Sequence, residues 1–219
     1  MTRIRHAFTT ALALTGLAVL AGISSPHLIG GAMAQSATTA LLAKPTSLPE
    51  MAIGDAKAPV TIVEFASMSC PHCAAFALNV FPMLRSNYID TGKVRYVFRE
   101  FPLDIKAASA SVLARCIAGG NAEKYFGAID TLFKLQDALM TQTKETMLSI
   151  GKQAGLDDKA VEDCVGNQSV MDKLSADETF AANELKVDAT PTFFINGKMV
   201  KGSMSFEEFE AKLKPLLKK

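Results

Sequence analysis

Apolar residues follow two different periods along this chain. The run from Val60 to Ala66 is apolar and rich in β-branched residues, which predicts a buried strand. A second strand is predicted for Val94 to Phe98, where the pattern alternates after a turn at Gly92. Between them, the segment from Pro71 towards Tyr88 has apolar residues at helical spacing, with a kink expected at Pro82. Such a β-α-β unit is expected to have parallel strands and a right-handed crossover.

The pattern becomes helical from Ile105 to Leu185. Apolar residues such as Ile129, Leu132 and Phe133 recur at helical spacing in this stretch, and Gly155 is one of its turn signals. We therefore predict an insertion of several short helices after the second strand.

Strand signals return near the C-terminus. Asn196-Gly197 lies between two strand-like runs, residues 192–195 and 198–200, which is a two-residue hairpin signature whose turn needs positive φ. Ser205 with Glu208 three residues later forms a capping box that should begin the last helix. The predicted order is therefore strand, helix, strand, helical insertion, hairpin and helix, which is an α/β arrangement.

The first 34 residues have the features of a secretory signal peptide. Arg3 and Arg5 precede an apolar run over residues 11–21, and Ala32-Met33-Ala34 supplies an A-x-A site, so cleavage is expected after Ala34. An uncleaved membrane anchor is the alternative, but the apolar run is shorter than the ~20 residues that span a bilayer. We expect an exported protein.

Removing this segment changes the formal charge from +1 to −1, because Arg3 and Arg5 are lost. No basic field then remains to indicate nucleic acid or an anionic membrane as a partner. Residues 35–50 are expected to be a linker or an unstructured leader, since residues 35–48 are rich in Ser, Thr, Ala and Pro and show no clear period.

The segment Cys70-Pro71-His72-Cys73 carries the strongest chemical signal. It follows the first predicted strand, and proline suits the first position of a helix, so Cys70 is predicted as the N-cap and Cys73 as the third helical residue. Free backbone N–H groups and the helix dipole at that position lower the pKa of a thiol, and protonated His72 would add to this. The pair therefore resembles a redox dithiol in which Cys70 is the nucleophile and Cys73 the resolving thiol.

Three alternatives compete with this interpretation. A zinc site would need further ligands, yet His6 and His27 lie in the segment expected to be removed, and no other thiols have knuckle spacing. An inert pair and a permanently closed structural disulfide are the others; so short a loop would contribute little stability. We expect no metal and no cofactor, because phosphate loops, hydrolase arrangements and metal-ligand helices are absent from the sequence.

Taken together, the order of elements and three motifs resemble the DsbA-like thiol-disulfide oxidoreductases, from Gly54 through the C-terminal helix. The motifs are Cys70-Pro71-His72-Cys73, Thr190-Pro191 before the late hairpin, and Glu64 six residues before the first cysteine. The resemblance implies a thioredoxin fold with an inserted all-helical domain. The expected division is a first thioredoxin part over residues 51–103, the helical insertion over 104–186 and a second thioredoxin part over 187–219.

The resemblance also implies roles for residues outside the Cys-x-x-Cys segment. Glu64 would lie beneath Cys73 and aid its proton transfer; the alternative is a carboxylate that points to solvent at a strand edge. Thr190-Pro191 would form a cis peptide bond against Cys70 and bind substrate through backbone groups of Thr190. Enterobacterial members carry valine before this proline, so Thr190 leaves substrate preference and potential open.

Cys116 and Cys164 lie in the predicted helical insertion. Some DsbA-like proteins have a second disulfide there, and a bond closing this loop would contribute about 4 kcal/mol by the chain-entropy estimate. We expect a structural disulfide; a second redox pair is the alternative.

The expected function is that of a monomeric periplasmic oxidase. It would donate the Cys70–Cys73 disulfide to reduced, newly exported polypeptides and be reoxidised by a quinone-linked, DsbB-like membrane partner. Two other functions stay open at this point: a disulfide isomerase or reductase, favoured by Thr190, and a non-catalytic binding module on a thioredoxin scaffold.

Overall fold

The computed structural model describes residues 35–218, so the predicted signal peptide lies outside the described residues. Within them, five strands form one sheet in the order β1-β3-β2-β4-β5. The strands are β1 (Met51–Ile53), β2 (Val60–Ala66), β3 (Val94–Glu100), β4 (Thr192–Ile195) and β5 (Lys198–Lys201). The helical elements are α2 (Pro71–Asn79), α3 (Phe81–Leu84), the π-helical turn η1 (Arg85–Ile89), α4 (Ile105–Ala118), α5 (Ala122–Lys134), α6 (Gln136–Thr141), α7 (Thr143–Gln153), α8 (Asp158–Val165), α9 (Gln168–Asn183), α10 (Phe206–Leu213) and the 3₁₀ turn η2 (Lys214–Leu216).

Strand β2 occupies the centre of the sheet. It pairs in parallel with β3 and antiparallel with β4, while β1 and β5 add antiparallel edges. The parallel pairing of β2 with β3, joined through α2, confirms the predicted β-α-β unit. Because β2 has a strand on each side and helices pack on both faces of the sheet, nearly all of its side chains are buried, and the segment that follows its end starts from the centre of the sheet.

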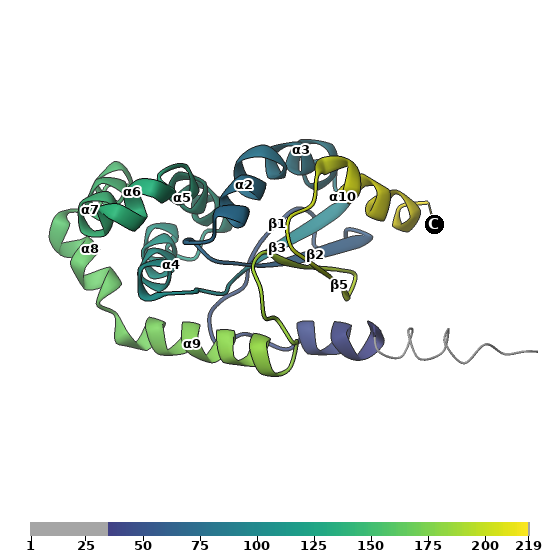
Figure 1. Ribbon diagram of the computed structural model, residues 1–219, viewed down its shortest axis with the longest axis horizontal. Helices are drawn as coiled ribbons and strands as arrows, with labels where there is room; N and C mark the ends of the chain where they lie inside the picture. The colour runs from purple at the N-terminus through teal and green to yellow at the C-terminus, as the bar shows by residue number, and fades with distance from the viewer. Residues whose placement is uncertain (1–34, 219) are drawn as a thin grey trace, which may run out of the picture.

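Helices cover both faces of this sheet (Figure 1). In the view shown, α2, α3 and α10 lie above the strands, where Phe76, Phe193 and Phe209 pack with ring centroids 4.8 to 5.4 Å apart. Below them, α9 and the N-terminal helix cover a second apolar cluster that includes Val63 and Phe194. The fold is thus the thioredoxin fold that the sequence predicts, with a mixed sheet between helical layers.

Helices α4 to α8 form a separate helical layer beside the sheet (Figure 1). A buried ion pair joins it to the end of β3, since Arg115 Nη2 donates to Glu100 Oε2 at 2.7 Å and Tyr125 Oη donates to Glu100 Oε1, also at 2.7 Å. Buried carboxylates need such partners. Helix α9 contacts two parts of the molecule: Leu174 packs with Val112 of α4, whereas Ala181 packs against the sheet.

The prediction of an unstructured leader is wrong for residues 35–42, which form a helix. This helix packs on the lower face of the sheet, where Leu42 joins the apolar cluster and its carbonyl accepts a hydrogen bond from Arg99 at 2.7 Å. Gln35 Nε2 also donates to the carbonyl of Asn196 in the β4–β5 turn at 2.8 Å. Tertiary packing therefore orders a segment whose composition favours disorder.

Local sequence signals predict the hairpin turn and the start of the last helix correctly. Asn196 and Gly197 adopt positive φ in the predicted hairpin turn, and Ser205 and Glu208 form the capping box at the start of α10. The helix after the cysteines breaks at Val80, just before the expected kink. Strand β1 was not predicted, because three residues are too few to show a period. No helix between residues 35 and 218 is both long and apolar enough to cross a membrane.

Candidate active site

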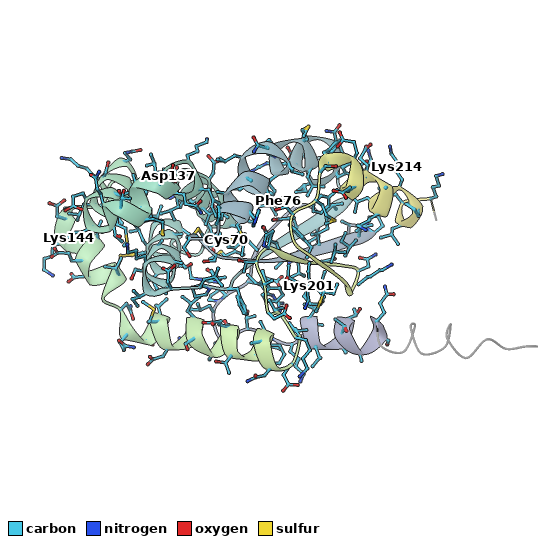
Figure 2. The ribbon with its side chains drawn as sticks, in the orientation of Figure 1. Cys70, Phe76, Asp137, Lys144, Lys201 and Lys214 are labelled. Atoms are coloured by element: carbon cyan, nitrogen blue, oxygen red, sulfur yellow. A yellow bond between two sulfur atoms is a disulfide. The ribbon has the colours of Figure 1, made fainter. Side chains whose placement is uncertain are left out.

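The predicted dithiol lies at the start of α2, at the centre of the molecule (Figure 2). Cys70 is the N-cap in an extended conformation, with φ −82° and ψ 117°, and Pro71 opens the helix. The carbonyl of Cys70 accepts hydrogen bonds from the backbone N–H groups of Cys73 and Ala74, both at 3.1 Å. Strand β2 and this cap together place the Cys70 side chain at the positive end of the helix.

The Cys70 thiol also faces the loop before β4. The Thr190–Pro191 bond is cis, and the Sγ of Cys70 lies 3.3 Å from the carbonyl oxygen of Thr190, to which the protonated thiol donates. Cys70 is 5% exposed, so only a small part of it faces solvent. The structure therefore brings Cys70, Thr190 and Pro191 together although 120 residues separate them in the chain.

The pKa of Cys70 is lowered to about 5. The hydrogen bond from the Cys73 thiol is the largest cause, and the Thr190 side chain and the backbone N–H groups of Cys73 and His72 add to it, while partial burial opposes the shift. Each of these donors stabilises the thiolate more than the thiol. Cys70 is consequently a thiolate at neutral pH. His72 itself is exposed at the surface.

Cys73 has the opposite environment. It is fully buried in the apolar cluster that also contains Phe76 and Phe193, and both cysteines are free thiols in this structure. Burial raises the pKa of the Cys73 thiol far above its ordinary value, and the nearby charge of Glu64 raises it further. The pKa values of the two thiols of the segment are therefore shifted strongly in opposite directions.

Glu64 points into the protein from the central strand. It is 3% exposed, which excludes the alternative of a solvent-facing carboxylate at a strand edge. The hydroxyl of Tyr96, from the neighbouring strand β3, donates a hydrogen bond to Glu64 Oε2. Burial raises the pKa of Glu64 to about 8, although the Tyr96 hydrogen bond lowers it. Glu64 is thus a neutral acid near pH 7 and can give or take a proton.

A small cavity adjoins this buried acid. Its volume is about 20 Å³, room for about one water molecule. The two polar groups nearest the core are Glu64 and Tyr96, and the walls are mostly aromatic: Phe76, Phe81, Phe98, Phe126 and Phe133. Asp130 of α5 also lines it.

Cys116 and Cys164 are joined by a disulfide, with their Cα atoms 6.0 Å apart. The bond connects the last turn of α4 to the last turn of α8, both in the helical layer. Among residues 35–218, no three His, Cys, Asp or Glu side chains gather in a way that could hold a metal ion.

Two residues of this site were not predicted from the sequence. Tyr96 contacts Glu64 only through the pairing of β2 with β3, and Gln136 of α6 donates hydrogen bonds to the loop before Cys70. A buried carboxylate signals that a donor must exist, but the sequence does not identify which residue supplies it.

Comparisons with known proteins show which family this chain resembles. Residues 46–215 match the family model described as Thioredoxin. A Rickettsia felis protein named "Putative protein-disulfide oxidoreductase" is 35% identical over 150 residues, which are 68% of this chain and 53% of that protein. The chain thus spans little more than half the length of this curated relative.

Solved structures resemble this chain over about four fifths of its length. The structure of α-DsbA1 from Wolbachia pipientis has a TM-score of 0.71 and 32% identity, covering 80% of this chain and 94% of that one. BdbD from Bacillus subtilis, at 20% identity and a TM-score of 0.66, shares the fold. From the family model, the fold and the α-DsbA1 match, we conclude that this chain belongs to the DsbA-like family of thioredoxin-fold proteins.

Proposed function

We propose that this chain is a periplasmic thiol-disulfide oxidoreductase that oxidises newly exported proteins. The observation that carries the proposal is the contrast between the two thiols: the pKa of Cys70 is about 5, whereas burial holds that of Cys73 far above its ordinary value. A stabilised Cys70 thiolate favours the reduced protein, which makes the disulfide form a stronger oxidant. The direction of electron flow is therefore from substrate to enzyme.

The reaction begins with the Cys70–Cys73 disulfide. A substrate thiolate attacks Cys70 Sγ, the bond between the two enzyme sulfurs breaks, and a mixed disulfide forms between Cys70 and the substrate. Cys73 leaves with the electron pair. Because burial makes a Cys73 thiolate costly, its departure needs a proton, and the neutral carboxyl of Glu64 is the donor that we assign to this step.

The second step releases the product. Another substrate thiolate attacks the substrate sulfur of the mixed disulfide, and Cys70 leaves as the stable thiolate. The substrate has then lost two electrons and holds a disulfide, while the enzyme is a dithiol. We assign the backbone of Thr190, beside the cis bond, to binding the extended substrate, and Cys116–Cys164 to a structural role.

Export through the predicted signal peptide would deliver the protein to an oxidising compartment. Reduced exported polypeptides are the proposed substrates, and a quinone-linked, DsbB-like membrane protein is the proposed reoxidant of a monomeric enzyme. The proposed reaction needs such a partner, because each turnover leaves Cys70 and Cys73 as thiols that must be reoxidised before the next.

Oxidation of a reduced peptide with two cysteines tests the proposal. The disulfide form should convert the peptide to its cyclic disulfide in a one-to-one reaction, and Cys70→Ser should not. A Cys73→Ala variant, first charged at Cys70 with a small thiol as a mixed disulfide, should release that thiol and accumulate a Cys70–peptide adduct when the peptide has a single cysteine, because no second thiol is then present to resolve it. Failure of the disulfide form to oxidise the peptide would defeat the oxidase proposal, and turnover only on scrambled disulfides would favour an isomerase.

A further inference from the structure

Gln136 connects the helical layer to the loop that carries the reactive cysteine. It is the first residue of α6, and its Nε2 donates to the carbonyl oxygens of Met68 at 2.9 Å and of Cys70 at 3.0 Å. The side chain is half-buried. One amide group thus holds two carbonyls of the segment between β2 and α2.

The Cys70 carbonyl that accepts from Gln136 is also the cap of α2. It accepts from the backbone N–H groups of Cys73 and Ala74, so its position sets the geometry of the first helical turn. The N–H groups of His72 and Cys73 in that turn are the ones that stabilise the Cys70 thiolate. Any movement of the Cys70 main chain therefore changes the hydrogen bonds at its own sulfur.

Other bonds hold the opposite end of the same loop. Ser67 Oγ accepts from the backbone N–H of Leu103 at 3.1 Å, and the Cys70 N–H donates to the Ser67 carbonyl at 3.1 Å. Leu103 follows strand β3, so its bond ties the loop to the sheet, whereas Gln136 belongs to α6 in the helical layer. Met68 lies between the two anchors and has its carbonyl bonded to Gln136.

We infer that Gln136 is a positioning residue for thiol-disulfide exchange: it fixes the main chain of Cys70 and so makes the acidity of the nucleophile depend on the helical layer. This inference rests on the proposed function. An amide suits the task because its two N–H groups donate to carbonyls without adding a charge beside the thiolate. A carboxylate at this position would lose both donors and repel the thiolate and the carbonyls together.

The test is the pH dependence of Cys70 alkylation by iodoacetamide in the reduced, full-length protein. Cys73 does not interfere because it is buried and its pKa is far above the range, and the modified residue is identified by peptide mass. Gln136→Ala should raise the midpoint by at least half a pH unit, about threefold in thiolate stability, and Gln136→Glu by more. Both should lower the equilibrium constant for oxidation of glutathione by a similar factor.

Gln153→Ala is the matched control, since Gln153 is an exposed amide at the end of α7 in the same helical layer, and its side chain bonds only Ser149 among residues 35–218. It should leave the midpoint unchanged. Hydrogen exchange of the backbone amides of Cys73 and Ala74 should become faster in Gln136→Ala, which separates loss of positioning from global unfolding.

Two outcomes separate this inference from the function on which it rests. If Cys70 titrates near pH 5 in the wild type and in both folded Gln136 variants alike, the inference is overturned and the proposed function stands. If wild-type Cys70 titrates like an ordinary thiol, the proposed function fails with it.

Discussion

The hydroxyl of Tyr96 on β3 donates a hydrogen bond to the buried carboxyl of Glu64 on β2. Burial and the proximity of Glu64 hold the pKa of Tyr96 well above its ordinary value, so the tyrosine keeps its proton and acts as a donor. This bond opposes, in part, the rise that burial causes in the pKa of Glu64. We therefore expect Tyr96 to set the pH range in which Glu64 can supply a proton in the proposed reaction.

Replacing Tyr96 by Phe should raise the pKa of Glu64 from about 8 by roughly one further pH unit, because the carboxylate loses its donor. Titration of the Glu64 carboxyl carbon by NMR measures the change directly. Tyr125→Phe is the control, since its hydroxyl bonds Glu100 instead. An unchanged Glu64 titration in Tyr96→Phe would show that the hydroxyl does not tune the acid.

Glu64→Gln should make the protein more stable above neutral pH. A carboxyl with a pKa of 4.5 when unfolded and about 8 when folded binds its proton more tightly in the folded protein. It therefore destabilises the fold increasingly as pH rises from 4.5 to 8. The variant and the wild type should be similarly stable near pH 4 and differ by roughly 4 kcal/mol at pH 8.

Urea unfolding at both pH values measures this difference. Glutamine can still accept the Tyr96 hydrogen bond, so packing around the site is retained. A gain in stability that is the same at pH 4 and pH 8 would contradict the shifted titration of Glu64.

Removal of the second disulfide should weaken the fold without removing exchange at Cys70. Replacing Cys116 and Cys164 together by Ala opens a loop with a sequence separation of 48, which should cost about 4 kcal/mol of unfolding free energy. Urea unfolding measures the loss, and peptide oxidation by the same variant should continue. Reduction of both disulfides at one common potential would contradict the structural role.

Thr190→Val should leave stability unchanged or raise it by up to ~1 kcal/mol. The Thr190 hydroxyl is buried and meets no hydrogen-bond geometry with another group among residues 35–218, although the Thr190 side chain helps to lower the pKa of the Cys70 thiol. Thr192→Val is a matched comparison two residues away, because its hydroxyl donates to the Ala189 carbonyl at 2.7 Å, and it should lose about 1 kcal/mol. A larger loss for Thr190 than for Thr192 in thermal unfolding would reveal a bonded hydroxyl.

Much of the site could be predicted because its signals are local or specific to a family. The positions of Cys70 and Cys73 follow from one helical turn and a proline, and the resemblance to DsbA-like proteins pointed to Thr190-Pro191 and Glu64. The hairpin at Asn196-Gly197 and the cap at Ser205 depend on residues within a few positions of each other.

The remainder depends on contacts between distant segments. Gln136 lies 66 residues from Cys70 and Tyr96 lies 32 from Glu64, so neither pairing leaves a periodic signal in the sequence. The helix of residues 35–42 was missed for the same reason, because it is held by Arg99 and by the β4–β5 turn rather than by its own composition. Strand β1 is ordered by pairing with β3.

The reduction potential of the Cys70–Cys73 pair, measured at equilibrium with glutathione, tests the proposed oxidase most directly. A Cys70 thiolate stabilised to a pKa of about 5 predicts a potential well above the value of about −270 mV for thioredoxin. The potential should lie closer to the value of about −120 mV for DsbA. A potential at or below that of thioredoxin would mean that the dithiol donates electrons, and it would contradict the oxidase.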